Sequence, residues 1–350
     1  MPTIGYGGAE MSLTRIAGYL SEHSKINVDL VVAKTLDKSD EIEISNEINI
    51  TYLNSKKTIL SLFKLLKFIR TSRPDVILST LPTPNILLIT LKQLRLIKSR
   101  VVIREANSNY LYWKKGLLNK IKGIIAVFAF NKSDANIFIS QELQSNLERY
   151  ISNKQNTTIY NPVFSHDFFE KSTEQVKNFK IPNAELWVTT SRLEHQKGLD
   201  VFFEASYSFL EKRNFSILVV GDGSLESFYK NKYSDLPVTF IGNTENPLKY
   251  LKLADIFFFP SRREGLGNSL IEAQILGKNI ISSDCPSGPK EIIKIFNNGT
   301  LFKSENINDL IEAIESIELK EDRDVSKEIV DKFSVEKVSE QYFQLLNNLI

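Results

Sequence analysis

Short apolar runs that alternate with helix-like segments are the feature of this sequence that most restricts its fold. In the second half, runs rich in β-branched and aromatic residues recur between amphipathic segments. These runs are 186–190, 216–220, 238–241, 256–260 and 279–283. The alternation is typical of βαβ units with a parallel sheet, and nearly continuous apolar strands indicate a sheet covered on both faces.

The first half repeats this pattern, which predicts a second doubly wound α/β domain. Strand-like runs lie at 26–33, 48–53, 75–80, 100–105 and 135–140, and helix-like segments at 58–71 and 85–97. A turn-rich connector at 159–169 separates the halves, and 350 residues suffice for two domains. We expect domains at 1–165 and 166–335, and a terminal helix at 336–350 that packs back on the first domain.

The start of the chain departs from the usual order of a doubly wound domain. It reads MPTIGYGGAE, a glycine-rich turn that leads into a helix-like segment. Such a turn normally follows a strand, and here only residues 1–4 precede it. We therefore expect either a first domain whose sheet lacks its first strand or a natural protein with residues before Met1.

Composition excludes several classes of protein. A single cysteine, Cys285, leaves no disulfide framework and favours a reducing compartment. The three histidines lie far apart, and no zinc-type spacing occurs. Because no apolar run reaches 18 residues and no secretory signal is recognised, we expect a cytoplasmic protein.

Positive charge gathers in the first half. Residues 1–165 hold 22 Lys and Arg against 13 Asp and Glu, and residues 56–122 hold 15 against two. Basic segments at 56–73 and 110–125, the second with Trp and Tyr, suit an anionic membrane surface. A solvated helix face and a nucleic acid are the alternatives. Since no nucleic-acid motif accompanies the charge, we expect membrane contact and no nucleic-acid partner.

Two loops that precede helices contain candidate phosphate-binding residues. Gly7 and Gly8 lead into the first helix-like segment, where bare backbone and free N–H groups can approach a phosphate. Arg192 and Lys197 follow an apolar run, and two cations at the carboxyl edge of a parallel strand suit a diphosphate. The alternatives are a tight turn for the glycines and a solvated loop for the cations. Each motif is weak by itself.

The stretch EGLGNSLIEAQILG at 264–277 is more specific. It sets Glu264 before a glycine-bearing turn and Glu272 inside a helix of about two turns. We expect Asn268 as the N-cap and Gly277 just after the helix. The two glutamates could accept hydroxyls of a sugar and a ribose, or could serve only as a surface charge and a dipole-compensating residue.

Together these motifs resemble the retaining glycosyltransferases of family 4, which have the GT-B architecture of two Rossmann-like domains facing across a cleft. Glu264 and Glu272 match the family's pair of glutamates separated by seven residues. GYGGAE, SRLEHQKG, GDG, ADIFFFPS, EGLGNSLIEA and SSDCPSGPKEI follow in the family's order and spacing. The resemblance covers essentially the whole chain and is most specific in 186–293.

The resemblance implies a role for each matching residue. Arg192 and Lys197 would bind the donor diphosphate and stabilise the leaving nucleotide, Glu264 would contact the donor sugar, and Glu272 would hold the ribose. The other implied donor-binding residues are Gly7, Gly8, Gly242, Asn243, Leu266, Gly267, Asn268 and Ser269. The family has a histidine on the acceptor side. This chain lacks it and has Arg104, Glu105 and Asn107 in that region instead. No metal is implied, because the two cations and helix dipoles would supply that charge.

We therefore expect a peripheral enzyme on the inner face of the cytoplasmic membrane. It would move a sugar from a nucleotide diphosphate donor, UDP-linked, to a lipid-linked oligosaccharide acceptor of a bacterial surface polysaccharide such as lipopolysaccharide or capsule. Two alternatives stay open: a nucleotide-sugar epimerase on the same architecture, and a non-catalytic or degenerate subunit that partners an active transferase.

Overall fold

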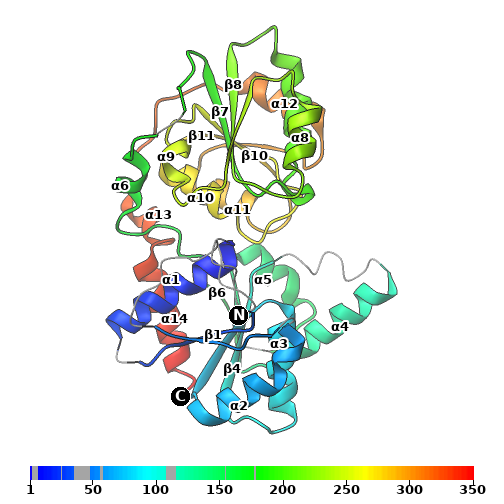
Figure 1. Cartoon of the computed structure of the whole chain (residues 1–350), viewed down its shortest axis with the longest axis vertical. Helices are drawn as coiled ribbons and strands as arrows, with labels where there is room; N and C mark the ends of the chain where they lie inside the picture. Colours follow the sequence, from blue (N-terminus) through cyan, green and yellow to red (C-terminus); the bar gives the residue numbers. More distant parts are fainter. Residues whose placement is uncertain are drawn as a thin grey trace. The chain divides into compact units, whose positions relative to one another are not determined.

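The computed structural model describes residues 1, 7–24, 26–34, 48–55, 58–107, 116–153, 155–176 and 179–350. They form two compact units, one of Met1–Val163 with Lys332–Ile350 and one of Phe164–Asp331 (Figure 1). The chain thus enters the second unit two residues before the expected boundary and returns to the first at Lys332 instead of 336. The strand ladders of both units are parallel, which confirms the predicted α/β class.

The second unit contains one six-stranded parallel sheet. Its strands are β7 (Glu185–Thr190), β8 (Phe215–Val220), β9 (Val238–Gly242), β10 (Ile256–Phe259), β11 (Asn279–Ser283) and β12 (Thr300–Phe302). Their order in space is β12-β11-β10-β7-β8-β9. The winding therefore reverses between β7 and β10, which is the place where doubly wound sheets bind ligands at their carboxyl edge.

Helices connect these strands and cover the sheet. They are α6 (Phe168–Thr173), α7 (Leu199–Ser206), α8 (Glu226–Lys232), α9 (Leu248–Leu251), α10 (Asn268–Ile275), α11 (Pro289–Phe296), α12 (Ile307–Ser316) and α13 (Lys327–Asp331). Inside, Trp187 of β7 stacks on Phe215 with ring centroids 4.1 Å apart, and Phe202 of α7 stacks on Phe258 of β10 at 4.3 Å. This aromatic core fixes β7 and β10 as a rigid base for the loops that follow them.

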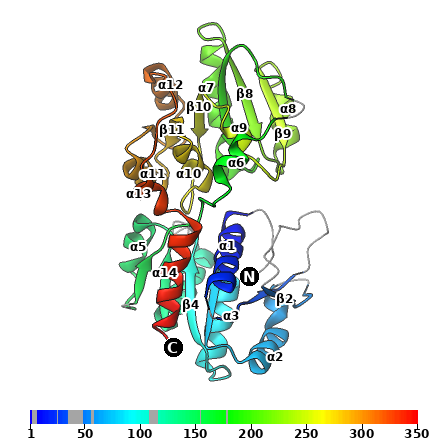
Figure 2. The same ribbon diagram turned by 90° about the vertical axis from the view of Figure 1, so that its left-hand side faces the viewer.

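The first unit contains two sheets. Strands β1 (Asp29–Val32) and β2 (Asn49–Tyr52) form one, and β3 (Val76–Thr80), β4 (Arg100–Glu105), β5 (Ala135–Phe138) and β6 (Asn156–Thr158) form the other (Figure 2). Met1 lies beside β1: its amino group donates to the carbonyl oxygen of Val31 at 2.7 Å, and its carbonyl accepts from the Ala33 N–H at 3.0 Å. Among the described residues, β1 and β2 pair with each other and not with β3–β6.

Helices cover the four-stranded sheet on both faces. The helices of this unit are α1 (Gly8–His23), α2 (Leu62–Ser72), α3 (Pro82–Gln93), α4 (Leu117–Lys132), α5 (Gln141–Glu148) and α14 (Val335–Asn347). Residues of α1 and α14 share one core cluster with Val102 of β4. Successive side chains of a strand alternate between faces, so Ile103 and Glu105 face α3 and α4 instead. None of the described helices combines the length and the apolar content that crossing a membrane requires.

Candidate active site

Two loops at the point where the second sheet reverses bring Lys197 and Glu264 together. Lys197 follows β7 and Glu264 follows β10, the neighbouring strand. The ammonium of Lys197 lies 2.7 Å from Oε1 of Glu264, and the hydroxyl of Ser261 donates to the same oxygen at 2.7 Å. Glu264 is 8% exposed, so its carboxylate depends on these two partners. Arg192, from the same loop as Lys197, is exposed.

Glycines allow the loop of Lys197 to lie close to its neighbours. Gly198 has φ +65°, and a Cβ on it would stand 2.1 Å from the carbonyl oxygen of Pro260 at the end of β10. A Cβ on Gly221, after β8, would stand 2.1 Å from the carbonyl oxygen of Ser191. Larger residues at these two positions would push the cationic loop away from both neighbouring strand ends.

Arg262, which follows β10 like Glu264, also holds the loop of Lys197, and the sequence did not indicate this role. Its Nη1 and Nη2 donate to the two carboxylate oxygens of Asp200 at 2.8 and 2.7 Å, and Nη1 also donates to the His195 carbonyl at 2.8 Å. Nε donates to Glu305 at 2.8 Å. Burial raises the pKa of Asp200, but the bonds from Arg262 outweigh it and lower the pKa overall. Since Arg262 and Arg263 are adjacent, the sequence could not say which one faces the loop.

Helix α10 begins next to this pair, but the expected cap is wrong. Gly267, with φ +91°, is the N-cap, and Asn268 is the first helical residue. The left-handed backbone of Gly267 turns the chain into the helix, so no side chain is needed as a cap. Gly277, with φ +73°, follows the helix as expected. Glu272 is half-buried in the second turn, and Leu266 and Ser269 flank the helix start.

The remaining donor-side residues lie at other ends of elements. Gly242 ends β9, and its carbonyl accepts from the Gly221 N–H at 2.8 Å, while Asn243 beside it is exposed. In the first unit, Gly7 is the N-cap of α1 and Gly8 its first residue. Gly5 lies outside the described residues. The roles implied for these residues stay predictions.

The three acceptor-side candidates point in different directions. Arg104 is fully buried on the α14 side of β4, where its Nε donates to the hydroxyl of Tyr342 at 3.0 Å and its Nη2 to Oδ1 of Asn161 at 2.6 Å. These contacts give Arg104 a structural role, which ties β4 to α14. Asn107 donates its backbone N–H to Oε1 of Glu105 at 3.1 Å.

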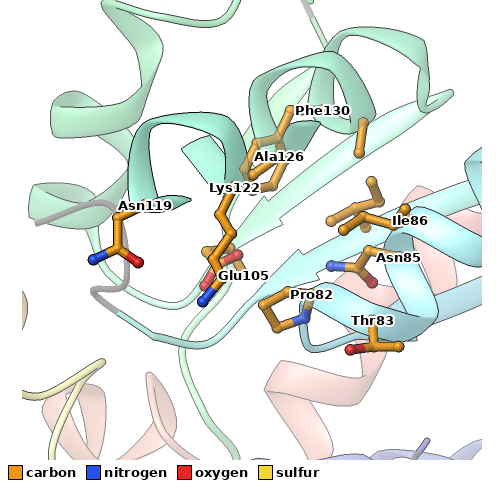
Figure 3. A pocket seen from close by; sticks show the side chains of 11 residues that line it. Pro82, Thr83, Asn85, Ile86, Glu105, Asn119, Lys122, Ala126 and Phe130 are labelled. Carbon is orange, nitrogen blue, oxygen red and sulfur yellow. The ribbon is translucent and has the colours of Figure 1, made fainter. Parts of the chain in front are cut away.

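Glu105 lines a pocket of about 560 Å³ between α3 and α4 (Figure 3). Burial raises the pKa of Glu105 to about 7, although the Asn107 N–H and the neighbouring Arg104 charge act in the opposite direction. Asn85 of α3 and Lys122 of α4 also line the pocket. In this pocket, the buried carboxyl group of Glu105 and the side-chain amide of Asn85 therefore line a space that a ligand could enter.

Helix α4 presents an apolar face to solvent. Its exposed apolar side chains are Leu117, Leu118, Ile121, Ile124, Ile125 and Phe128, between 39% and 75% exposed. The helix holds three lysines and no acidic residue. Phe63 of α2 is also exposed, at 82%. Residues 56–57 and 108–115, which include four of the lysines expected to contact a membrane, lie outside the described residues.

Two families of known proteins match this chain, one in each half. "Glycosyltransferase Family 4" matches residues 6–164, and "Glycosyl transferases group 1" matches residues 170–331. The chain is a glycosyltransferase, and its two halves together support the GT-B type of group 1 and family 4. It is therefore an enzyme of the hexosyltransferase kind.

Relatives of this glycosyltransferase extend over most of its length. A Campylobacter jejuni "GalNAc-alpha-(1->4)-GalNAc-alpha-(1->3)-diNAcBac-PP-undecaprenol alpha-1,4-N-acetyl-D-galactosaminyltransferase" is 27% identical over 98% of this chain and 96% of its own. An Escherichia coli "O-antigen biosynthesis glycosyltransferase WclY" is 24% identical, over 96% and 98%. An uncharacterized glycosyltransferase of Methanocaldococcus jannaschii is 27% identical, over 68% of this chain and 62% of its own length.

Solved structures share the fold of this glycosyltransferase. Sucrose-phosphate synthase from Thermosynechococcus elongatus has a TM-score of 0.78 at 18% identity, covering 98% of this chain and 94% of its own. Anabaena HepE in complex with UDP has a TM-score of 0.75 at 16% identity, covering 99% and 98%. At these identities the likeness establishes the GT-B fold, with two Rossmann-like domains.

Proposed function

We propose that this glycosyltransferase moves a sugar from a UDP-linked donor, with retention of anomeric configuration, to a lipid-linked oligosaccharide of a bacterial surface polysaccharide. The Lys197–Glu264 pair carries the proposal, because it lies where the second sheet reverses and where such sheets bind nucleotides. The names of the Campylobacter and Escherichia relatives support the acceptor class, and the UDP complex of the Anabaena enzyme supports the donor.

The pair divides the work at the donor. An ammonium has three N–H donors, so its bond to Glu264 leaves Lys197 two more for oxygens of the leaving diphosphate. Among the described residues both hydrogen bonds to Glu264 end on Oε1, which leaves Oε2 to accept a hydroxyl of the donor sugar. Arg192 would add a second cation, and the first-turn N–H groups of α10 would stabilise phosphate charge.

We extend the proposal to the cofactor: transfer needs no metal, because Arg192, Lys197 and the start of α10 supply positive charge to the diphosphate. The check is turnover measured with EDTA and with added Mg²⁺. Equal rates agree with the proposal, and a rate that vanishes in EDTA and returns with Mg²⁺ contradicts it.

We also propose that the enzyme works at the inner face of the cytoplasmic membrane and that α4 contacts the bilayer. Large apolar side chains and lysines together, without acids, favour an anionic lipid surface. The lipid part of the acceptor would reach the enzyme from the same surface.

One experiment tests the central proposal. Nucleotide sugars are screened for protection against thermal unfolding, and the best donor is incubated with an undecaprenyl-diphosphate-linked oligosaccharide. We expect one UDP-sugar to raise the unfolding temperature, and proton NMR of the product to show the anomeric configuration of the donor. Inversion contradicts the retaining mechanism, and a lack of stabilisation by every UDP-sugar contradicts the donor class.

A further inference from the structure

The pocket between α3 and α4 combines apolar walls with two buried polar groups. Ile103, Ala126 and Phe130 are among the apolar residues around it. Asn85 extends from α3 toward the side chains of α4, and Figure 3 shows the two helices facing each other across the space. At about 560 Å³, the pocket is large enough for a substituted monosaccharide and not only for a water molecule.

Asn85 indicates which kind of ligand fits the pocket. It is 4% exposed, and its Oδ1 has no hydrogen-bond partner within the described structure. An unpaired buried amide costs about 1–3 kcal/mol, which a ligand recovers by supplying the missing bond. A hydrocarbon chain, such as the isoprenoid of a lipid carrier, would fill the apolar space but leave Asn85 unpaired. The pocket therefore selects against a purely apolar occupant.

Glu105 adds a second polar group at the carboxyl end of β4. It is 8% exposed, and Oε1 accepts the Asn107 N–H, which leaves Oε2 to bond a ligand. Asn85 offers the N–H groups of its amide as donors and Oδ1 as an acceptor, and the carboxyl group of Glu105 adds a further acceptor or, when protonated, a donor. A matching ligand carries an N–H and a C=O close together and ends in a small apolar group.

We propose that this pocket binds the acetamido group of the acceptor's terminal sugar. The acetamido N–H donates to Oδ1 of Asn85, its C=O accepts from the protonated carboxyl group of Glu105, and its methyl group lies against the apolar wall. A plain hydroxyl group has one polar atom and no methyl group. It would therefore make only some of these hydrogen bonds and would not fill the apolar part of the pocket. The inference rests on the proposed function and deepens it, since it names amino sugars as the acceptor class.

Saturation-transfer NMR on the full chain tests this inference with two probes, methyl N-acetylgalactosaminide and methyl galactoside. Methyl glycosides are used because a longer alkyl chain would bind the exposed face of α4. We expect saturation of the acetyl methyl protons and at least about tenfold tighter binding of the acetamido probe. Equal binding of both probes would overturn the proposal.

Variants locate the binding. Asn85→Leu should weaken the binding of the acetamido probe at least about tenfold. The variant should fold, because it removes an unpaired polar group from an apolar site. Ala126→Leu, which fills the pocket from α4, should have the same effect and serves if Asn85→Leu is unstable. Thr90→Val is the control. It changes an exposed residue of α3, the helix of Asn85, that does not line the pocket, and this variant should bind the probe like the unchanged protein. Unchanged affinity in both pocket variants would refute the assignment.

Donor turnover keeps this test separate from that of the proposed function. If UDP-sugar is consumed but acceptors with and without the acetamido group react equally well, the pocket assignment fails and the proposed function stands. If no nucleotide sugar binds or reacts, the proposed function fails whatever the NMR result.

Discussion

The ammonium of Lys197 and the carboxylate of Glu264 lie 2.7 Å apart, although 67 residues separate them in the chain. Both follow adjacent strands of the second sheet, so the strand order alone places their loops together. Each residue neutralises its partner in a largely buried place, and each has a proposed second task, which is to contact the donor. Substitution of either one therefore changes both stability and turnover.

Replacing Lys197 by Ala should lower the turnover of the donor by about 10²–10³-fold, because a preorganised positive charge at the leaving group is lost. Arg192→Lys keeps a charge in an exposed position and should cost less. A donor-hydrolysis assay compares the two, with unfolding temperatures as the control for folding. Equal and negligible losses would remove the loop from the diphosphate site.

Arg262→Lys should loosen the cationic loop. Lysine cannot form the two parallel bonds to Asp200 or reach the His195 carbonyl at the same time, so we expect a loss of about 2 kcal/mol in the free energy of unfolding. Urea titration measures it. Lys212→Ala, which breaks an exposed ion pair with Glu315, is the control and should change the unfolding free energy little. A loss no greater than that of the control would contradict the clamp.

Glu272→Ala should weaken the binding of the nucleotide roughly tenfold to a hundredfold, the value of one or two hydrogen bonds between a carboxylate and ribose hydroxyls. Isothermal titration calorimetry with UDP measures the affinity. Glu315→Ala, an exposed acid on α12, is the matched control. An unchanged dissociation constant for Glu272→Ala would exclude Glu272 from the site.

Glu105→Gln should change how stability depends on pH. Burial raises the pKa of Glu105 in the folded protein to about 7, above its value in the unfolded chain. Its contribution to stability is therefore fully present below about pH 4 and is lost as the pH rises through about 7, on the order of 3 kcal/mol in total. Arg104 acts on Glu105 electrostatically, and Lys122 lines the same pocket. Glutamine does not ionise, so the variant should gain stability over the unchanged protein between pH 5 and pH 8.5. Denaturation curves measure the stability of both proteins at pH 5 and at pH 8.5. The same difference in stability between variant and unchanged protein at both pH values would contradict this prediction.

The exposed face of α4 should govern binding to membranes. The protein should sediment with vesicles that contain phosphatidylglycerol at low salt and be released at high salt. Ile124→Ser and Leu117→Ser each remove a large apolar side chain and should weaken binding roughly tenfold or more. Leu94→Ser, equally exposed but outside α4, should not. If all three variants sediment like the unchanged protein, α4 is not the contact.

Local patterns were sufficient to predict most strands of the second unit. The five expected apolar runs agree with β7 to β11 to within a residue or two, because fully covered parallel strands must be apolar along their whole length. β6 and β12 were missed. Their sequences, NTT and TLF, are three residues long and carry too little periodicity for a prediction. Asn268 was misjudged as a cap because a glycine in a left-handed conformation leaves no side-chain signal.

The sequence by itself determined the α/β class, the two-unit division, the positions of Arg192, Lys197 and Glu264 after strands, and the position of Glu272 inside a helix, because these depend on short-range periodicity and spacing. Only the tertiary structure decided that Lys197 pairs with Glu264, that the Arg262 guanidinium binds Asp200 and the His195 carbonyl, and that Arg104 turns away from the pocket that Glu105 lines. Those outcomes depend on which strands are neighbours and on which face of a strand each side chain occupies. Contacts between residues distant in sequence fix both.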